Sequence, residues 1–205
     1  MKKILLICNG GAESAKFLRA QAKNNFTLCA DGGANIAARA GVAPDAVIGD
    51  MDSVTAAARK KFKKARWLKI DNQNNTDFDK ALDYIKNSGA KEAVIVCAAG
   101  GRLDFTLNNL RAAAEYLHYF DIVFKSAQWE IYPLNKTKKF KCRRGARVSL
   151  LPLELCKNVS LSGLEYPLKN KNLTPGETLT LSNRAAKNNF EVKMEKGLML
   201  AYIEV

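Results

Sequence analysis

Two aspartates one residue apart follow the apolar run Ala46-Val47-Ile48, in the segment Gly49-Asp50-Met51-Asp52-Ser53. On an extended segment, residues i and i+2 point to the same side, so Asp50 and Asp52 would repel each other unless a cation lay between them. An isolated Asp-x-Asp is usually a solvated turn. Three other acidic loops also follow apolar runs, and they contain Asp31, Asp77 and Asp104. The series therefore predicts a cation site at one edge of a parallel sheet.

Glycines in two of these loops indicate that an anionic ligand accompanies the cation. Gly32-Gly33 lets a ligand approach the backbone, and the helix expected to start there offers free amide groups to an anion. Arg102 lies in a second glycine turn, Gly100-Gly101-Arg102-Leu103-Asp104, which is typical of a phosphate site at a helix start. Asp104 also has a purely structural interpretation, as the residue that caps that helix.

The composition excludes several kinds of chemistry. The 205 residues are 47% hydrophobic and 26% charged, as in ordinary globular proteins, and the net charge of +13 favours anionic partners. His118 is the only histidine, so neither a serine–histidine triad nor a histidine-rich zinc site is expected. Acid–base work would therefore fall to carboxylates.

The five cysteines form no Cys-x-x-Cys pair, and three of them lie inside apolar runs. This pattern predicts a reducing cytoplasm, without disulfides or a cysteine zinc site. The apolar run after Met1-Lys2-Lys3 is shorter than the core of a signal peptide. We therefore expect a first buried strand there, no targeting segment and no membrane span.

A parallel sheet would bring the acidic loops together, and the first part of the chain has the pattern for one. Apolar runs alternate with segments of helical periodicity. The expected strands are residues 4–8, 26–30, 46–48, 67–70, 93–98 and 121–124. Thr76 and Asp79 have capping-box-like spacing at the start of a helix. The buried stripe expected for that helix is Phe78, Ala81, Leu82 and Ile85, and for the helix after Arg102 it is Leu107, Leu110, Ala114 and Leu117.

The character of the chain changes after residue 126. Short β-type runs then recur, many of them separated by turns that contain proline or glycine, at residues 129–132, 147–151, 159–161, 177–181, 190–194 and 198–205. We expect an α/β domain with a parallel, Rossmann-like, doubly wound sheet over residues 1–126, followed by an all-β, sandwich-like domain over residues 127–205.

A series of motifs carries a resemblance to a known family. They are Asp31-Gly32-Gly33-Ala34-Asn35, Gly49-Asp50-Met51-Asp52-Ser53, residues 73–82, Gly101-Arg102-Leu103-Asp104, and residues 162–168 with Ser182-Asn183. In their order and spacing, and in its β-rich second half, the chain resembles the thiamine pyrophosphokinases, also called thiamine diphosphokinases. Asn74 and Phe105 stand where that family usually has an acidic residue and a histidine, and Leu200 aligns with a common tryptophan.

The resemblance implies that ATP donates its diphosphate group to the hydroxyethyl group of thiamine, giving thiamine diphosphate and AMP, with Mg²⁺ as the cofactor. It implies a Mg²⁺–triphosphate centre made of Asp50, Asp52 and Asp77. Asp104 would be a supporting carboxylate or a weak base, and Arg102 and Lys80 would hold phosphate oxygens. The nucleotide pocket would be shaped by Asp31, Gly32, Gly33, Asn35, Ser53, Gln73, Thr76 and Asn109.

The second half of the chain would supply the thiamine side of the site. Ser182 and Asn183 would hydrogen-bond the aminopyrimidine, whose ring nitrogens need polar partners. The family works as homodimers with sites at the interface, so the resemblance implies a homodimer with shared sites. The cysteine pattern and the resemblance together predict a cytoplasmic protein. Its substrates would be thiamine and ATP, and we expect no nucleic-acid or membrane partner.

Two other functions stay open at this point. The same metal–phosphate residues would serve a diphosphotransferase or nucleotidyltransferase that acts on another small alcohol. The excess of lysine and arginine would suit a nucleic-acid-binding module, whose affinity would fall steeply with salt and would not need Asp52. The clustered base-stacking aromatic residues that such a module uses are not seen in the sequence.

Overall fold

The computed structural model describes residues 3–72 and 74–205, and the chain divides into two compact units, residues 1–127 (unit 1) and residues 128–205 (unit 2). Gln73, which was predicted to shape the nucleotide pocket, lies outside the described residues. Within the described part of the chain, no helix has the length and apolar character needed to cross a membrane. The five cysteines are free thiols.

Unit 1 is built on a parallel sheet, as the apolar runs predicted. Its strands are β1 (Lys3–Ile7), β2 (Phe26–Ala30), β3 (Ala46–Gly49), β4 (Arg66–Lys69), β5 (Glu92–Val96) and β6 (Asp121–Lys125). They lie in the order β6-β5-β1-β2-β3-β4, and every neighbouring pair is parallel. The central strands read as unbroken apolar runs because helices cover both of their faces.

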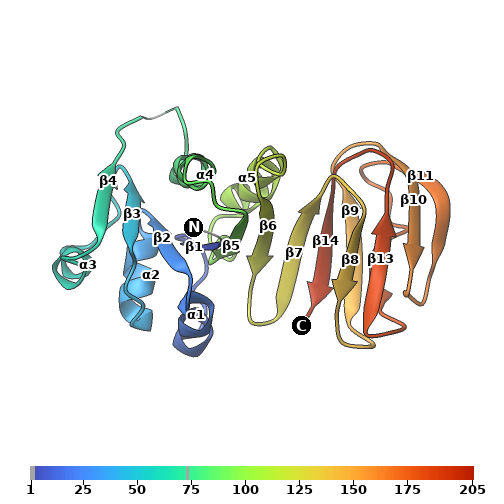
Figure 1. Ribbon diagram of the computed structural model, residues 1–205, viewed down its shortest axis with the longest axis horizontal. Helices are drawn as coiled ribbons and strands as arrows, with labels where there is room; N and C mark the ends of the chain where they lie inside the picture. The colour runs from blue at the N-terminus through green and yellow to red at the C-terminus, as the bar shows by residue number, and fades with distance from the viewer. Residues whose placement is uncertain (1–2, 73) are drawn as a thin grey trace. The chain divides into compact units, whose positions relative to one another are not determined.

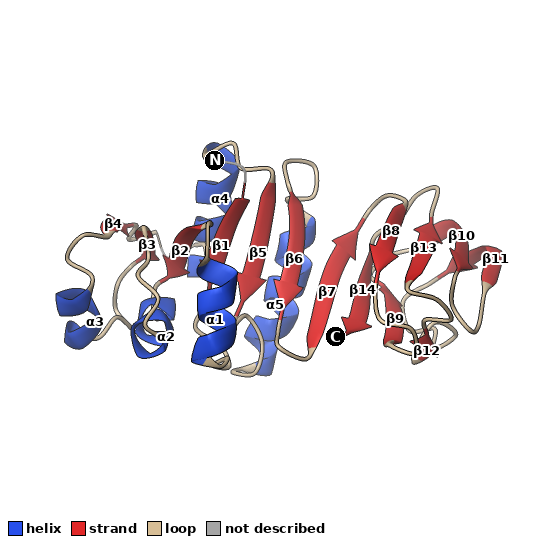
Figure 2. Cartoon of the chain, turned by 60° about the horizontal axis from the view of Figure 1, so that its bottom comes forward, coloured by secondary structure: helices blue, strands red, loops and turns tan. Residues whose placement is uncertain are grey.

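Five helices connect these strands. They are α1 (Ala15–Ala22), α2 (Gly33–Ala40), α3 (Ala56–Lys61), α4 (Asp77–Asn87) and α5 (Leu103–Ala114). Figure 1 shows α1, α2 and α3 on one face of the sheet and α4 and α5 on the other, and Figure 2 shows the same layers from a second direction. The chain therefore changes sides between β1 and β5, and such a switch point leaves a crevice outside the carboxyl ends of the two strands.

Two glycines in the loop after β1 hydrogen-bond the loop after β5, across this crevice. The Gly10 N–H donates to the carbonyl oxygen of Cys97 at 2.7 Å, and the Gly11 N–H donates to that of Ala99 at 2.6 Å. A Cβ atom on Gly10 would lie only 2.6 Å from the Cys97 carbonyl oxygen. Only glycine therefore lets the loop after β1 pair with the loop after β5.

Helix α4 follows the sequence prediction. Thr76 and Asp79 form the capping box, in which each side chain accepts from the other residue's backbone N–H. The predicted stripe, which is Phe78, Ala81, Leu82 and Ile85, is buried. The capping box fixes the first turn of α4, and so it fixes the position of Asp77.

Helix α5 departs from the prediction. Leu107 is exposed, the helix ends at Ala114 before Leu117, and the buried residues are Asn109, Ala113 and Ala114. A polar residue takes the inner face because the Asn109 side chain donates to the Ala98 carbonyl oxygen at 3.2 Å. The cap position at the helix start is Arg102, and Asp104 lies in the first turn, so Asp104 is not the capping residue.

Unit 2 consists of two antiparallel sheets around one core. Its strands are β7 (Trp129–Leu134), β8 (Lys138–Lys141), β9 (Arg147–Pro152), β10 (Cys156–Ser162), β11 (Leu168–Leu173), β12 (Asn183–Arg184), β13 (Asn189–Lys193) and β14 (Met199–Glu204). Within this unit, one sheet has the order β12-β9-β14-β7 and the other the order β11-β10-β13-β8. Val148, Phe190 and Met199 are among the residues that both sheets contribute to the core.

Two kinds of error affect the β predictions for unit 2. The strand expected at residues 177–181 is wrong, because this segment is a turn region joined to β9 through Thr180, which exchanges hydrogen bonds with Leu150. Strands β8 and β11 were missed because lysine and asparagine make up most of their residues. An edge strand with so few apolar residues gives no strong periodic signal.

The packing of α4 and α5 predicts opposite outcomes for two leucine substitutions. Leu82→Ala should lower the free energy of unfolding by about 2–5 kcal/mol, because it leaves a cavity beneath α4. Leu107→Ala is the matched control, since Leu107 is 61% exposed and its loss should change stability by less than about 0.5 kcal/mol. Urea denaturation of both variants measures the difference. Equal losses would contradict this assignment of the buried faces.

Candidate active site

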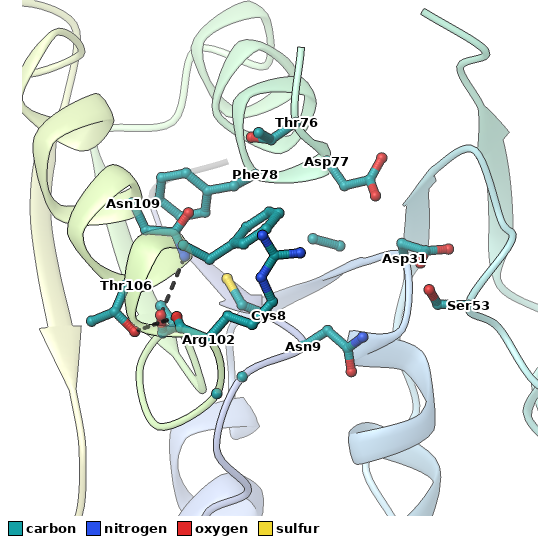
Figure 3. Close-up of a pocket in the computed structure, with 15 residues that line it drawn as sticks. Cys8, Asn9, Asp31, Ser53, Thr76, Asp77, Phe78, Arg102, Thr106 and Asn109 are labelled. Carbon is teal, nitrogen blue, oxygen red and sulfur yellow. Dashed lines mark hydrogen bonds between the residues drawn. The ribbon is translucent and has the colours of Figure 1, made fainter. Parts of the chain in front are cut away.

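A cavity of about 410 Å³ lies at the carboxyl ends of the unit 1 strands. The volume is in the range of small-molecule sites. Its lining comes from the loops after β1, β2, β3 and β5 and from the starts of α4 and α5. The lining residues are Cys8, Asn9, Gly10, Ala30, Asp31, Ser53, Thr76, Asp77, Phe78, Ala98, Gly101, Arg102, Phe105, Thr106 and Asn109. In Figure 3, Asp31, Ser53 and Asp77 lie on one side of the cavity, and Arg102 and Thr106 come from the opposite side.

Three carboxylates converge at one side of the cavity. We call Asp31, Asp50 and Asp77 the acidic group. Each residue contributes one carboxylate oxygen, and these three oxygens lie within 4.8 Å of one another. Asp31 follows β2, Asp50 follows β3, and Asp77 begins α4. Asp31 is only 4% exposed, and among the described residues its Oδ1 has no hydrogen-bond partner. A buried, unpaired carboxylate oxygen is costly unless a ligand completes it.

Gly49 allows these carboxylates to approach one another. A Cβ atom at this position would lie 2.9 Å from the Cβ of Asp31 and 3.0 Å from Oδ1 of Asp77. The backbone at Gly49 also has a φ of +145°, which side chains other than glycine rarely adopt. Any other residue would push the acidic group apart.

The charges around the acidic group are only partly balanced. Burial raises the pKa of Asp31 above its ordinary value, and the nearby charges of Asp77 and Asp52 add to this, while the neighbouring Ser53 side chain and Gly32 backbone oppose it. The Lys80 ammonium lies 2.9 Å from Oδ1 of Asp77, and its side chain is only 6% exposed. Lys80 is therefore a buried counter-charge to Asp77, and it is not among the residues that line the cavity.

The expected extended geometry between Asp50 and Asp52 is wrong. Strand β3 ends at Gly49, and Met51 has a φ of +71°, so the chain turns between the two aspartates. The Asp52 N–H donates to Oδ1 of Asp50 at 3.1 Å, and the exposed Asp52 side chain accepts from Ser53 Oγ at 2.9 Å. The third member of the acidic group is Asp31, whereas the sequence analysis had named Asp52 together with Asp50 and Asp77.

Arg102 supplies positive charge from the α5 side. Its Nη2 donates to Oδ2 of Asp104 at 2.6 Å, and its guanidinium carbon lies 4.6 Å from the centre of the Phe105 ring. The hydrogen bond from Arg102 lowers the pKa of Asp104, so this carboxyl is a weaker base than a free aspartate. Both charged groups are exposed, which leaves Arg102 free to exchange partners.

The structure distributes the other predicted residues over several positions. Ser53, Thr76 and Asn109 line the cavity, and Oδ1 of Asn109 is a second buried atom with no hydrogen-bond partner among the described residues. Gly32 and Gly33 are buried at the start of α2, beside Asp31. Asn35 contacts the loop after β3. Asn74 is exposed, and its N–H donates to Asn72.

Sequence reasoning missed the contribution of β1 and of the aromatic lining. Asn9 and Gly10 follow a buried strand, which is the same signal that singled out Gly32 and Gly33, so they were within reach of prediction. Phe78 and Phe105 also line the cavity, although Phe78 was expected only as a core residue. The buried Cys8 thiol has a raised pKa because of its burial, so it is poorly suited to act as a nucleophile.

In unit 2, Asn183 has an internal role. It is 4% exposed, its Oδ1 accepts from the Tyr166 N–H at 3.1 Å, and its Nδ2 donates to the Tyr166 carbonyl oxygen at 2.7 Å. This bidentate contact fixes the loop that carries the exposed Tyr166 ring. Ser182 is exposed, and its N–H donates to Ser149 Oγ at 3.0 Å. Leu200, aligned with the common tryptophan, is buried in β14.

Comparisons with known proteins agree for both units. Residues 17–124 match the family described as thiamin pyrophosphokinase, catalytic domain, and residues 134–199 match thiamin pyrophosphokinase, vitamin B1 binding domain. Thiamine pyrophosphokinase of Bacillus subtilis is 26% identical over 168 residues, which cover 78% of each chain. Thiamine pyrophosphokinase 1 of Arabidopsis thaliana is 27% identical over 202 residues, covering 84% of this chain and 75% of the relative.

Solved structures show the same fold over the whole length. The crystal structure of thiamine pyrophosphokinase from Bacillus subtilis aligns with a TM-score of 0.89 at 23% identity, covering 100% of this chain and 99% of the other. Thiamin pyrophosphokinase from Candida albicans aligns with a TM-score of 0.83 at 19% identity, covering 100% and 89%. The two family matches together with these relatives show that the chain belongs to the thiamin pyrophosphokinase family.

Proposed function

We propose that this protein transfers the diphosphate group of ATP to the hydroxyethyl oxygen of thiamine, giving thiamine diphosphate and AMP. The observation that carries the proposal is the acidic group, of which Asp31 and Asp77 line the cavity of about 410 Å³ together with Arg102. Phosphoryl-type transfer requires positioning and charge neutralisation more than a nucleophilic side chain. The family membership does not favour transfer to another alcohol or a nucleic-acid-binding role.

The residues of the acidic group fit Mg²⁺. They offer hard carboxylate oxygens within 4.8 Å of one another, and Oδ1 of Asp31 is buried and unpaired among the described residues. Asp50 and Asp77 would hold the ion together with Asp31 or with Asp52, which lies on the same loop as Asp50. When bound, Mg²⁺ would neutralise charge on the triphosphate oxygens and make the phosphorus more electrophilic.

The remaining side chains of the cavity hold and orient the nucleotide. Arg102 exchanges Asp104 for phosphate oxygens and stabilises negative charge that develops on the departing AMP. Lys80, buried against Asp77, acts mainly by holding that carboxylate in place and by balancing charge near the phosphates. Asp104 keeps Arg102 at the cavity and, because its pKa is lowered, is at most a weak base for the thiamine hydroxyl group.

Unit 2 supplies the thiamine side in this proposal. Ser182 offers a polar group to the aminopyrimidine, and Asn183 shapes the site by fixing the backbone of Tyr166. Several apolar side chains near this segment are exposed: Leu179 and Leu181 precede it, Tyr166 is hydrogen-bonded to Asn183 through its backbone, and Leu151 follows Leu150, which bonds to Thr180. We take them as the surface that a second copy of the chain covers in a homodimer with shared sites.

Two finer features complete the proposal. Unit 1 is a Rossmann-like, doubly wound domain, supported by its parallel strand order and by helices on both faces, while unit 2 is sandwich-like, supported by its two sheets around one core. The five free cysteines support a cytoplasmic location.

The first test concerns the products. Thiamine with MgATP should yield thiamine diphosphate and AMP in equal amounts, because diphosphate transfer breaks the bond between the α- and β-phosphates. Chromatography of the reaction mixture identifies both products. If ADP and thiamine monophosphate accumulate instead, the enzyme is a simple kinase and the proposal is wrong.

A second test separates the aspartates. Asp50→Asn, Asp52→Asn and Asp77→Asn should each lower kcat by about a hundredfold or more, since each removes a negative charge that would hold the Mg²⁺ on which charge stabilisation depends. Glu92→Gln is the control, because Glu92 pairs with Lys3 at the opposite end of the sheet. If Asp52→Asn retains activity while Asp31→Asn, Asp50→Asn and Asp77→Asn do not, Asp31 is the third metal ligand.

A third test concerns shared sites. Mixing Asp50→Asn with Asn183→Ala should restore about a quarter of wild-type activity after subunit exchange, because half of the dimers are mixed and each contains one intact site. Mixing Asp50→Asn with Asp77→Asn should restore nothing, since every unit 1 then carries a lesion. Heterodimers demonstrated by native mass spectrometry that stay inactive in the first mixture would show that each chain builds its own site.

A further inference from the structure

The loop that carries Asp50 and Asp52 is held from outside by two side chains. We call residues 50–55 the acidic loop. Asn35, on the first turn of α2, spans its second half: its Nδ2 donates to the Ser53 carbonyl oxygen at 2.8 Å, and its Oδ1 accepts from the N–H of Thr55 at 3.0 Å and from Thr55 Oγ1 at 2.8 Å. Both ends of the Asn35 amide are therefore engaged by the loop.

Arg59, on α3, holds the first half of the same loop. Its Nη2 donates to the Met51 carbonyl oxygen at 2.8 Å, and its guanidinium carbon lies 5.5 Å from the centre of the Trp67 ring. Met51 has a φ of +71°, a conformation that non-glycine residues adopt only at a cost in energy. The hydrogen bond from Arg59 thus acts at the residue where the loop turns, between Asp50 and Asp52.

The contacts described for both side chains are with the protein itself. The described residues that line the cavity include neither Asn35 nor Arg59. Thr55, which Asn35 contacts, is the N-cap residue of α3, so the two contacts tie the acidic loop to the starts of two helices. Asp31, a member of the acidic group, immediately precedes Gly32, the N-cap residue of α2.

We propose that Asn35 and Arg59 are positioning residues that fix Asp50 and Ser53 of the acidic loop relative to Asp31 and Asp77. This inference rests on the proposed function, because it assigns the pair to the Mg²⁺ centre of that reaction. The acidic group combines residues that follow two strands with one that begins α4, and repulsion between like charges acts to push the acidic loop away from Asp31 and Asp77. Asn35 and Arg59 oppose that displacement without adding a ligand.

The chemistry of each contact predicts how its variants behave. Asn35→Ala removes three hydrogen bonds from the loop. Asn35→Asp keeps the acceptor for Thr55 but places an oxygen where the donor to the Ser53 carbonyl oxygen was. Arg59→Met removes the hydrogen bond to the Met51 carbonyl oxygen. Arg59→Lys keeps a positively charged donor on a shorter side chain, so it should retain part of the positioning effect.

The test measures Mn²⁺ binding to the nucleotide-free full-length protein by electron paramagnetic resonance, together with kcat and KM for both substrates and the thermal midpoint. Asn35→Ala and Arg59→Met should weaken Mn²⁺ binding by about tenfold to a hundredfold, as is typical when a partner of a metal ligand is lost. Their kcat should fall at low Mg²⁺ and recover at high Mg²⁺, while KM for thiamine stays unchanged. Arg59→Lys should lie between wild type and Arg59→Met.

Two matched controls separate positioning from general stability. Asn25→Ala removes an asparagine that donates to the Gln21 carbonyl oxygen at the end of α1, and Lys60→Met removes a positive charge next to Arg59 on the same helix. Both controls should bind Mn²⁺ as the wild type does. Equal weakening in the controls, or unchanged Mn²⁺ binding in folded Asn35→Ala and Arg59→Met, would overturn the inference.

The outcome also distinguishes this inference from the proposed function. A wild-type protein that forms no thiamine diphosphate, or that binds no Mn²⁺, contradicts the proposed function itself. A wild type that does both, with variants that match it, contradicts only the roles of Asn35 and Arg59. If Asn35→Ala does not fold, Asn35→Asp and the Arg59 pair decide the question.

Discussion

Mutual repulsion among Asp31, Asp50 and Asp77 is the constraint on which the rest of unit 1 depends. Two like charges at the 4.8 Å limit of this group repel each other by about 3–4 kcal/mol at an effective dielectric constant of about 20. Lys80 offsets part of this repulsion at Asp77, and the raised pKa of Asp31 shows that its charged form is disfavoured. A cation at the acidic group would remove the remaining imbalance.

The fold supplies the geometry that holds these charges together. Asp31 and Asp50 follow neighbouring parallel strands, and Asp77 starts the helix that returns from β4 toward β5. Gly49 leaves room between them, and the capping box of α4 fixes the turn on which Asp77 lies. Parallel strand ends, close-packed glycines and capping boxes are common in folded proteins. In unit 1 they act together to keep three carboxylates at one edge of the sheet.

The parallel strands of unit 1, and the acidic loops at their carboxyl ends, could be predicted from the sequence. Unbroken apolar runs mark buried parallel strands, and short loops follow them. Of the predicted metal ligands Asp50, Asp52 and Asp77, two lie in the acidic group, whose third member is Asp31, a residue predicted only for the nucleotide pocket. The reason is local: the left-handed turn at Met51 cannot be read from an alternation rule that assumes an extended chain. The exposed face of α5 and the internal hydrogen bonds of Asn183 were likewise missed, because they depend on tertiary contacts with Ala98 and Tyr166.

The two sides of the cavity differ in how firmly their charges are held. The acidic group is held by buried contacts, by Gly49 and by helix starts. The Arg102 side chain is exposed, and the contacts described for it are with Asp104 and with the Phe105 ring, two and three residues away. An exposed ion pair contributes little to stability, so exchanging Asp104 for phosphate oxygens costs little. In the proposed function, a metal ion at the acidic group would bind the triphosphate, and Arg102 would then exchange Asp104 for phosphate oxygens. This arrangement lets a protein of net charge +13 keep a locally acidic site that suits both a metal ion and a cationic acceptor.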